Sequence, residues 1–95
     1  MDTAMDETIG REIRDFIVAN FLFGQDAAGL TDDASFLEGG IIDSTGVLEL
    51  VAFLEQQYGI AVGDRELLPQ NLDSVQNAAG FVARKLEAQG ARVAR

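Results

Sequence analysis

The dipeptide Asp-Ser occurs twice in this sequence, at Asp43-Ser44 and at Asp73-Ser74, each before apolar residues at helical spacing. Asp and Ser are favoured N-cap residues because their side-chain oxygens accept hydrogen bonds from backbone N–H groups of the first helical turn. Both copies can therefore be helix caps. A serine at a helix N-terminus is also well placed for a phosphate, since free N–H groups and the helix dipole favour negative charge there.

The residues that precede Ser44 distinguish it from Ser74. Gly39 and Gly40 allow the backbone to turn tightly, and two isoleucines after them can anchor the end of a loop. A long amphipathic stretch follows Ser44 and presents it at a helix N-terminus. We therefore interpret Asp73-Ser74 as a plain cap and Ser44 as the candidate for phosphate chemistry.

Most other chemistry is excluded by composition, because the sequence contains neither cysteine nor histidine. Disulfides, thiolate nucleophiles, the usual zinc sites and proton transfer by imidazole are thereby removed. Catalysis by carboxylates alone would need an apolar pocket, which the small core of a 95-residue chain can hardly provide. We expect a protein that is not an enzyme and has no metal site; a small carboxylate-based hydrolase is the less favoured alternative.

Charge and hydropathy limit the partners. The formal net charge is -9, and every charged residue between Arg14 and Arg65 is Asp or Glu. Such a field repels nucleic acids and anionic membranes and favours proteins with basic patches, although solubility alone is an alternative explanation. No apolar run approaches the roughly 20 residues of a membrane-spanning helix, and the N-terminus is acidic where a signal peptide is basic. We expect a cytoplasmic protein.

Three stretches, residues 3–22, 44–58 and 73–88, have apolar residues at spacings typical of amphipathic helices. Asp73 and Gln76 are spaced as in a capping box at the start of the third helix. A short helix is predicted over residues 64–68 and is ended by Pro69, the only proline.

Residues 23–43 show no sustained period and form a long loop, whose scattered apolar residues suggest that it is pinned across the core. Residues 1–5 and 89–95 have little apolar support and are expected to be mobile. The sequence therefore predicts one domain over residues 1–95. Its fold class is an all-α four-helix bundle, with three longer helices, one short helix and a long first loop.

The surroundings of Ser44 resemble the signature of acyl, peptidyl and D-alanyl carrier proteins. The helix order, the long first loop and residues 71–75 also fit that family, so the resemblance covers most of the chain. The matching residues are Phe36 to Thr45 (FLEGGIIDST), followed by Val47, Glu49-Leu50-Val51, Leu54-Glu55 and Tyr58-Gly59-Ile60.

This resemblance implies an acyl-carrier-protein-like fold and a covalent 4′-phosphopantetheine arm on Ser44. A phosphopantetheinyl transferase would attach the arm from coenzyme A with magnesium, and its thiol would hold an acyl or aminoacyl group as a thioester. The lack of cysteine agrees, because such a chain can carry a thioester only on an imported thiol. Asp43 resembles the family's motif aspartate, which would hold the loop and help the transferase and its metal approach; a simple helix cap is an equally open interpretation.

Two departures from fatty-acid carriers concern the second helix. Many of those carriers have leucine after the serine, whereas Thr45 and Gly46 stand here, and Glu49 and Glu55 are fewer acids than is typical. The resemblance then implies a stand-alone monomeric carrier of lipid or secondary-metabolite biosynthesis, loaded by an adenylate-forming acyl or aminoacyl ligase or by an acyltransferase. Thr45 and the two glutamates are candidate partner-binding residues, with a solvated helix face as the alternative for the glutamates. An acidic helical interaction module without a prosthetic group is the alternative function.

Overall fold

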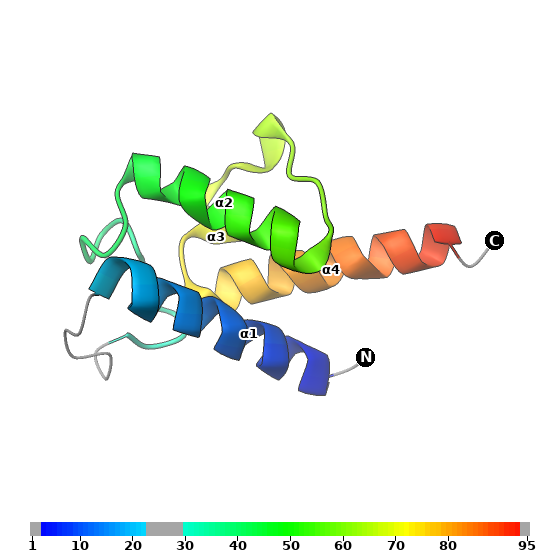
Figure 1. The fold of residues 1–95 in the computed structure, drawn as a ribbon, viewed down its shortest axis with the longest axis horizontal. Helices are drawn as coiled ribbons and strands as arrows, with labels where there is room; N and C mark the ends of the chain where they lie inside the picture. The colour runs from blue at the N-terminus through cyan, green and yellow to red at the C-terminus, as the bar shows by residue number, and fades with distance from the viewer. Residues whose placement is uncertain (1–2, 23–29, 94–95) are drawn as a thin grey trace.

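The computed structural model describes residues 3–22 and 30–93, and Figure 1 shows them as a bundle of helices. No strand occurs in these two described ranges, so the all-α prediction with three longer helices is confirmed. The elements in chain order are α1 (Thr3–Ile17), the π-helical turn η1 (Val18–Leu22), α2 (Ser44–Tyr58), the 3-10 turn η3 (Asp64–Glu66), α3 (Pro69–Leu72) and α4 (Val75–Val93).

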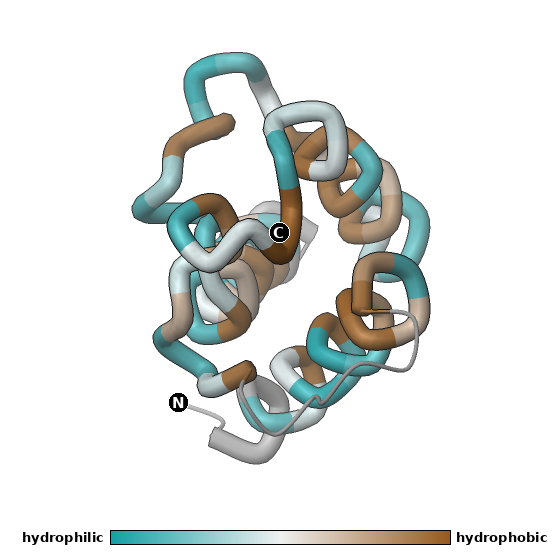
Figure 2. Tube along the Cα trace, turned by 90° about the vertical axis from the view of Figure 1, so that its left-hand side faces the viewer, coloured by the Kyte–Doolittle hydropathy of each residue, from teal (hydrophilic) through white to brown (hydrophobic). Residues whose placement is uncertain are grey.

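The three longer helices pack around one apolar core. α1 buries Ile9, Ile13 and Ile17, which lie one helical turn apart and so share a face. Figure 2 looks along the longest axis and shows the helices arranged around a common interior. Burial of each such side chain stabilises the fold by about 1.5–3 kcal/mol. The other helical core residues include Leu50, Val51 and Leu54 of α2 and Val75, Ala78, Ala79, Phe81 and Val82 of α4.

The described part of the long loop, residues 30–43, is fixed to the core at three points. Leu30, Phe36 and Ile42 are only 3%, 0% and 2% exposed. Arg14 of α1 also holds the loop, because its guanidinium donates hydrogen bonds to the carbonyl of Leu30 and to the carboxylate of Asp32. The predicted pinning is therefore confirmed for this part, whereas residues 23–29 lie outside the described residues.

The short helix before α4 differs from the prediction. Pro69 begins α3 instead of ending a helix, and the segment expected as one helix over residues 64–68 is the shorter turn η3 followed by two non-helical residues, Leu67 and Leu68. The residue before Pro69, Leu68, has φ -119° and ψ 145°, as the proline ring favours. Proline is well tolerated at the first helical position, since no backbone N–H is needed there.

The last helix is longer than predicted, whereas the first begins where the sequence placed it. α4 continues to Val93 instead of ending at Ala88, because Gly90 weakens a helix by about 1 kcal/mol but does not end it. α1 begins at Thr3, as predicted for the first helix, and so includes residues 3–5, which were also expected to be mobile. Residues 1–2 and 94–95 lie outside the described residues, and mobility of the ends stays a prediction.

Candidate functional site

Ser44 is the first residue of α2, and its side chain is exposed. The residue before it, Asp43, has extended backbone angles and caps the helix. Its Oδ1 accepts a 2.7 Å hydrogen bond from the N–H of Gly46, and its carbonyl accepts a 3.1 Å bond from the N–H of Val47. The cap interpretation of Asp43 is confirmed. Because Asp43 does the capping, the Ser44 hydroxyl is left at the exposed helix N-terminus.

A close approach of three segments sets the position of this helix start. A Cβ at Gly46 would lie 2.6 Å from Cγ2 of Ile42 and 2.9 Å from Cε1 of Phe21. Glycine at this position therefore lets the first turn of α2 pack directly against the loop end and η1. In the sequence, Gly46 stands out only as a departure from the fatty-acid carrier pattern, because the fold alone brings Ile42 and Phe21 to it.

The turn before Ser44 is closed by Phe36. The backbone carbonyl of Phe36 accepts hydrogen bonds from the N–H groups of Ile41, at 2.9 Å, and Ile42, at 3.2 Å. Gly40 lies within this turn and has φ 69°, a left-handed conformation that glycine adopts without strain. The tight turn predicted from the glycine pair is therefore present, and it delivers the chain to Asp43 and Ser44.

The second Asp-Ser copy is built differently. Ser74 caps α4, because its Oγ accepts a 3.0 Å hydrogen bond from the N–H of Asn77, and its side chain is only 4% exposed. The predicted capping box of Asp73 and Gln76 is wrong: the N–H of Gln76 donates to the carbonyl of Asp32, and the carboxylate of Asp73 bonds to the loop. The plain-cap interpretation thus holds for the serine of this copy and fails for its aspartate.

A small pocket of about 210 Å³ opens beside Ser44, between the start of α2 and the η3–α3 segment. Two of its leucines, Leu37 and Leu68, are 43% and 40% exposed, so apolar surface is accessible at the serine. The lining residues are Leu37, Ser44, Val47, Leu67, Leu68, Pro69, Leu72 and Asp73. A flexible group attached to the Ser44 oxygen can therefore extend into solvent or contact the apolar wall of this pocket.

A second hollow, of about 430 Å³, lies on another side of the helix start and contains Asp43, Thr45 and Glu49. The structure thus brings together Asp43 and two of the three residues predicted to bind partners. Glu55 does not line this hollow, and its Oε2 accepts a 2.9 Å hydrogen bond from the N–H of Val62 in the same chain. One oxygen of Glu55 is therefore engaged internally, whereas Thr45 and Glu49 are exposed.

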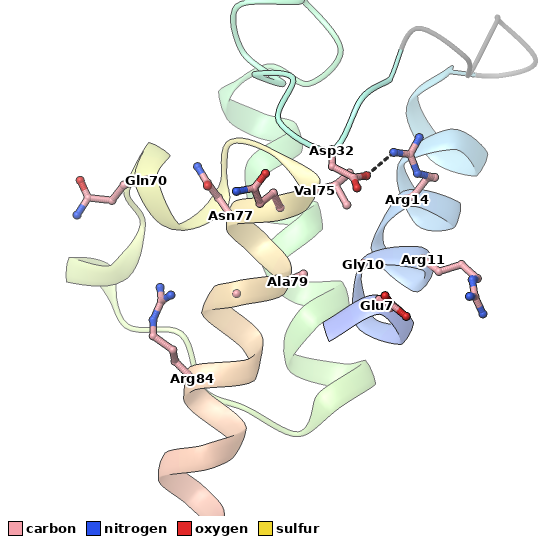
Figure 3. Close-up of a pocket in the computed structure, with 12 residues that line it drawn as sticks. Glu7, Gly10, Arg11, Arg14, Asp32, Gln70, Val75, Asn77, Ala79 and Arg84 are labelled. Carbon is pink, nitrogen blue, oxygen red and sulfur yellow. Dashed lines mark hydrogen bonds and ion pairs between the residues drawn. The ribbon is translucent and has the colours of Figure 1, made fainter. Parts of the chain in front are cut away.

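A third hollow, of about 780 Å³, lies between α1 and α4, and neither Ser44 nor Asp43 lines it. Figure 3 shows that the side chains of Arg11, Arg14 and Arg84, which line it, point apart. Arg14 turns to Asp32, with a nitrogen to oxygen distance of 2.5 Å. Because these cations do not converge, the hollow is not a formed anion site.

Residues 3–22 and 30–93 contain no group of three or more acidic side chains that could hold a metal ion. In the same part of the chain, every helix is too short or too polar to cross a membrane.

Comparisons with known proteins agree with the geometry. Residues 22–82 match the family described as a phosphopantetheine attachment site. An acyl carrier protein of Solidesulfovibrio magneticus is 28% identical over 78 residues, which cover 82% of this chain and 95% of that protein. The probable acyl carrier protein PigG of a Serratia species is 34% identical over 68 residues, covering 72% and 77%. The polyketide-8 synthase acyl carrier protein 2 of Streptomyces avermitilis is 36% identical over 84 residues, covering 88% of each chain.

Proposed function

Because this chain belongs to the phosphopantetheine-attachment family of carrier proteins, we propose that Ser44 bears its 4′-phosphopantetheine arm and that the arm carries an acyl or aminoacyl group. Members of this family hold the arm covalently and leave catalysis to partner enzymes. The arm supplies a thiol, on which the carried group is held as a thioester.

The observation that carries the proposal is the contrast between the two serines. The Ser44 side chain is exposed at the first position of a long helix, and the neighbouring Asp43 makes the capping bond. The Ser74 side chain is 4% exposed, and its hydroxyl oxygen is used as the cap. Of these two serines, only Ser44 offers a hydroxyl that a transferase can reach without unfolding the start of a helix.

The surroundings of Ser44 fit a phosphate-linked arm. The N-terminus of a helix of this length favours negative charge, which suits a phosphodiester on the first residue. The adjacent apolar pocket can contact the uncharged part of an arm as it leaves the serine. In the transfer, the Ser44 oxygen forms a bond to the phosphorus of coenzyme A that bears the pantetheine. The phosphoanhydride bond breaks, 3′,5′-ADP leaves, and the serine proton passes to the transferase or to water.

The hollow formed by Asp43, Thr45 and Glu49 supports docking of the transferase and other enzymes. Two carboxylates beside the attachment residue favour approach by basic patches. Glu55 belongs to the same proposal, although it is half-buried and one of its oxygens accepts a hydrogen bond from the backbone of Val62. We include a monomeric state and a cytoplasmic location in this proposal.

A specialised biosynthetic pathway is the proposed setting. Thr45 and Gly46 after the serine support it, and one relative is named as a carrier of a polyketide synthase. The proposed loading enzymes are an adenylate-forming acyl or aminoacyl ligase or an acyltransferase. The intact mass of the protein isolated from its own cells would report the arm and the attached cargo together.

Incubation with coenzyme A, magnesium and a broad-specificity transferase, followed by intact mass spectrometry, tests the attachment residue. We expect one added arm on the wild type and on Ser74→Ala, and none on Ser44→Ala. Because Ser44 is exposed and makes no capping bond, circular dichroism should show that Ser44→Ala keeps its helices. An unmodified wild type, or an arm on Ser44→Ala, would refute the assignment.

A further inference from the structure

We propose that Asp73 is a positioning residue for the modification of Ser44: it clamps the turn that delivers Ser44 and so sets how well the transferase engages the chain. This inference rests on the proposed function of Ser44. Asp73 lies almost thirty residues further along the chain, at the junction between α3 and α4, yet both residues line the same small pocket.

Asp73 makes hydrogen bonds to three consecutive loop residues. Its Oδ2 accepts from the hydroxyl of Ser35, its carbonyl oxygen accepts from the N–H of Phe36 at 2.8 Å, and its Oδ1 accepts from the N–H of Leu37 at 2.9 Å. Ser35 also accepts a 3.1 Å bond from the N–H of Glu38 through its hydroxyl oxygen. One residue thus holds the whole first half of the turn.

The clamp reaches Ser44 through Phe36. The Phe36 ring is fully buried, and its carbonyl accepts the N–H groups of Ile41 and Ile42, which close the second half of the turn. Ile42 packs against the first turn of α2, where a Cβ on Gly46 would meet its Cγ2. A continuous series of hydrogen bonds and packing contacts therefore joins the Asp73 carboxylate to the helix end that presents Ser44.

A carboxylate suits this task better than a neutral side chain. Both of its oxygens accept hydrogen bonds here, and bonds to an ionised acceptor are roughly twice as strong as neutral ones. Asparagine would keep one acceptor and lose the charge, and alanine would leave the N–H of Leu37 and the hydroxyl of Ser35 without this partner. Both variants would keep the backbone carbonyl at position 73, which accepts the hydrogen bond from the N–H of Phe36.

Loss of the clamp should act on binding more than on the chemical step. A looser turn reduces the fraction of molecules in which Ser44 and its pocket have the bound arrangement, and the apparent affinity falls by that fraction. The hydroxyl itself, its exposure and the Asp43 cap are unchanged. We therefore expect a higher KM of the carrier as a transferase substrate, with little change in kcat.

The test compares steady-state transfer kinetics and amide hydrogen exchange for the wild type and for variants of this region. Asp73→Ala should raise KM about three- to tenfold and leave kcat within about twofold, with about tenfold faster exchange at the Leu37 amide, as expected when one hydrogen bond to a charged group is lost. Asp73→Asn should lie between Asp73→Ala and the wild type. If Asp73→Ala fails to fold, Ser35→Ala carries the test, because it removes one donor of the clamp and should raise KM by about two- to threefold.

Ser74→Ala is the matched control, since it removes the α4 cap at the next residue without touching the turn. It should lower the melting temperature and keep the wild-type KM. The proposal is overturned if Asp73→Ala and Ser74→Ala have equal KM values at a temperature where both are folded, or if Leu37 exchange is unchanged in Asp73→Ala. A wild type that takes no arm is recognised before any variant is compared, and it refutes the proposed function together with this inference.

Discussion

Replacement of Gly46 by alanine tests the close packing that positions Ser44. The added Cβ would lie 2.6 Å from Cγ2 of Ile42 and 2.9 Å from Cε1 of Phe21, which is closer than real Cβ contacts. Ile42 is only 2% exposed, so its methyl group has little room to move away. The first turn of α2, the loop end or η1 must therefore shift.

The expected cost of Gly46→Ala is about 1–2 kcal/mol of unfolding free energy. Overpacking of this kind costs about 1–3 kcal/mol, whereas alanine returns up to about 1 kcal/mol of helix propensity, and less in a first turn. For a chain of this size, each 1 kcal/mol corresponds to a melting temperature change of about 4–8 °C. Urea and thermal unfolding followed by circular dichroism would measure both quantities.

Gly10→Ala in α1 is the matched control. A Cβ at Gly10 would lie 3.8 Å from Cγ1 of Val75 and 3.9 Å from Cβ of Ala79, which are ordinary contacts. The same chemical change should therefore raise stability there by about 0.5–1 kcal/mol. The packing argument is refuted if Gly46→Ala is as stable as the wild type, or if the two variants shift stability in the same direction.

Three further predictions use other contacts. The pKa of Glu66 is lowered by a hydrogen bond from the backbone of Gly63 and by Lys85, so its carboxylate stabilises the fold above the unfolded-state value of 4.5 and loses this effect as pH falls through the lower folded-state pKa. Glu66→Gln should accordingly be less stable than the wild type at neutral pH in urea titrations, with a difference that shrinks in acid; a constant difference would contradict this. Asp43→Asn keeps a capping oxygen and should change stability by less than about 0.5 kcal/mol, against about 1 kcal/mol for Asp43→Ala. If the transferase then modifies Asp43→Asn more slowly than the wild type, the charge of Asp43 assists the transfer. If the two rates are equal, Asp43 acts only as the helix cap. Leu50 is 0% exposed, so Leu50→Ala should lower the free energy of unfolding by about 2–5 kcal/mol. A decrease below about 1 kcal/mol in urea unfolding would contradict the place of Leu50 in the core.

The features that the sequence predicted well are those set by neighbours in the chain. The apolar periods place Ile13, Leu50 and Val82 in the core, and all three are fully buried. The start of α2 at Ser44 and its end before Gly59, which has φ 67°, also follow from local signals. Local geometry of this kind needs no knowledge of the rest of the fold.

The features that sequence reasoning missed depend on residues far apart in the chain. Asp73 has the spacing of a capping residue, but its carboxylate accepts hydrogen bonds from the hydroxyl of Ser35 and the N–H of Leu37. Only the folded loop brings these two donors near Asp73. Gly46 is needed because Phe21 and Ile42 converge on it. Such contacts have no periodic signal, so a single sequence gives no means of finding them.

In each Asp-Ser copy one side chain caps the helix and the other is left for another role, but the two copies assign these roles in opposite ways. The reason is that the helix of the first copy begins at the serine of its pair, whereas that of the second begins at the residue after its serine. α2 starts at Ser44, so Asp43 caps and the serine is free; α4 starts at Val75, so Ser74 caps and Asp73 is free to hold the loop.

This difference predicts the result of exchanging the first pair. In the double variant Asp43→Ser with Ser44→Asp, the serine would take the capping bond, and the acid at the first helical position would be favoured by the helix dipole. Serine and aspartate are similarly good caps, so we expect the free energy of unfolding to change by less than about 1 kcal/mol. A change of about 1 kcal/mol would shift the melting temperature by about 4–8 °C, so the melting temperature should stay within a few degrees of the wild type. The chain should take no arm in the mass assay, because its only serine at this helix start would be engaged as a cap. An arm on this folded double variant would show that the transferase needs a serine near the turn and not a free hydroxyl at the first helical position.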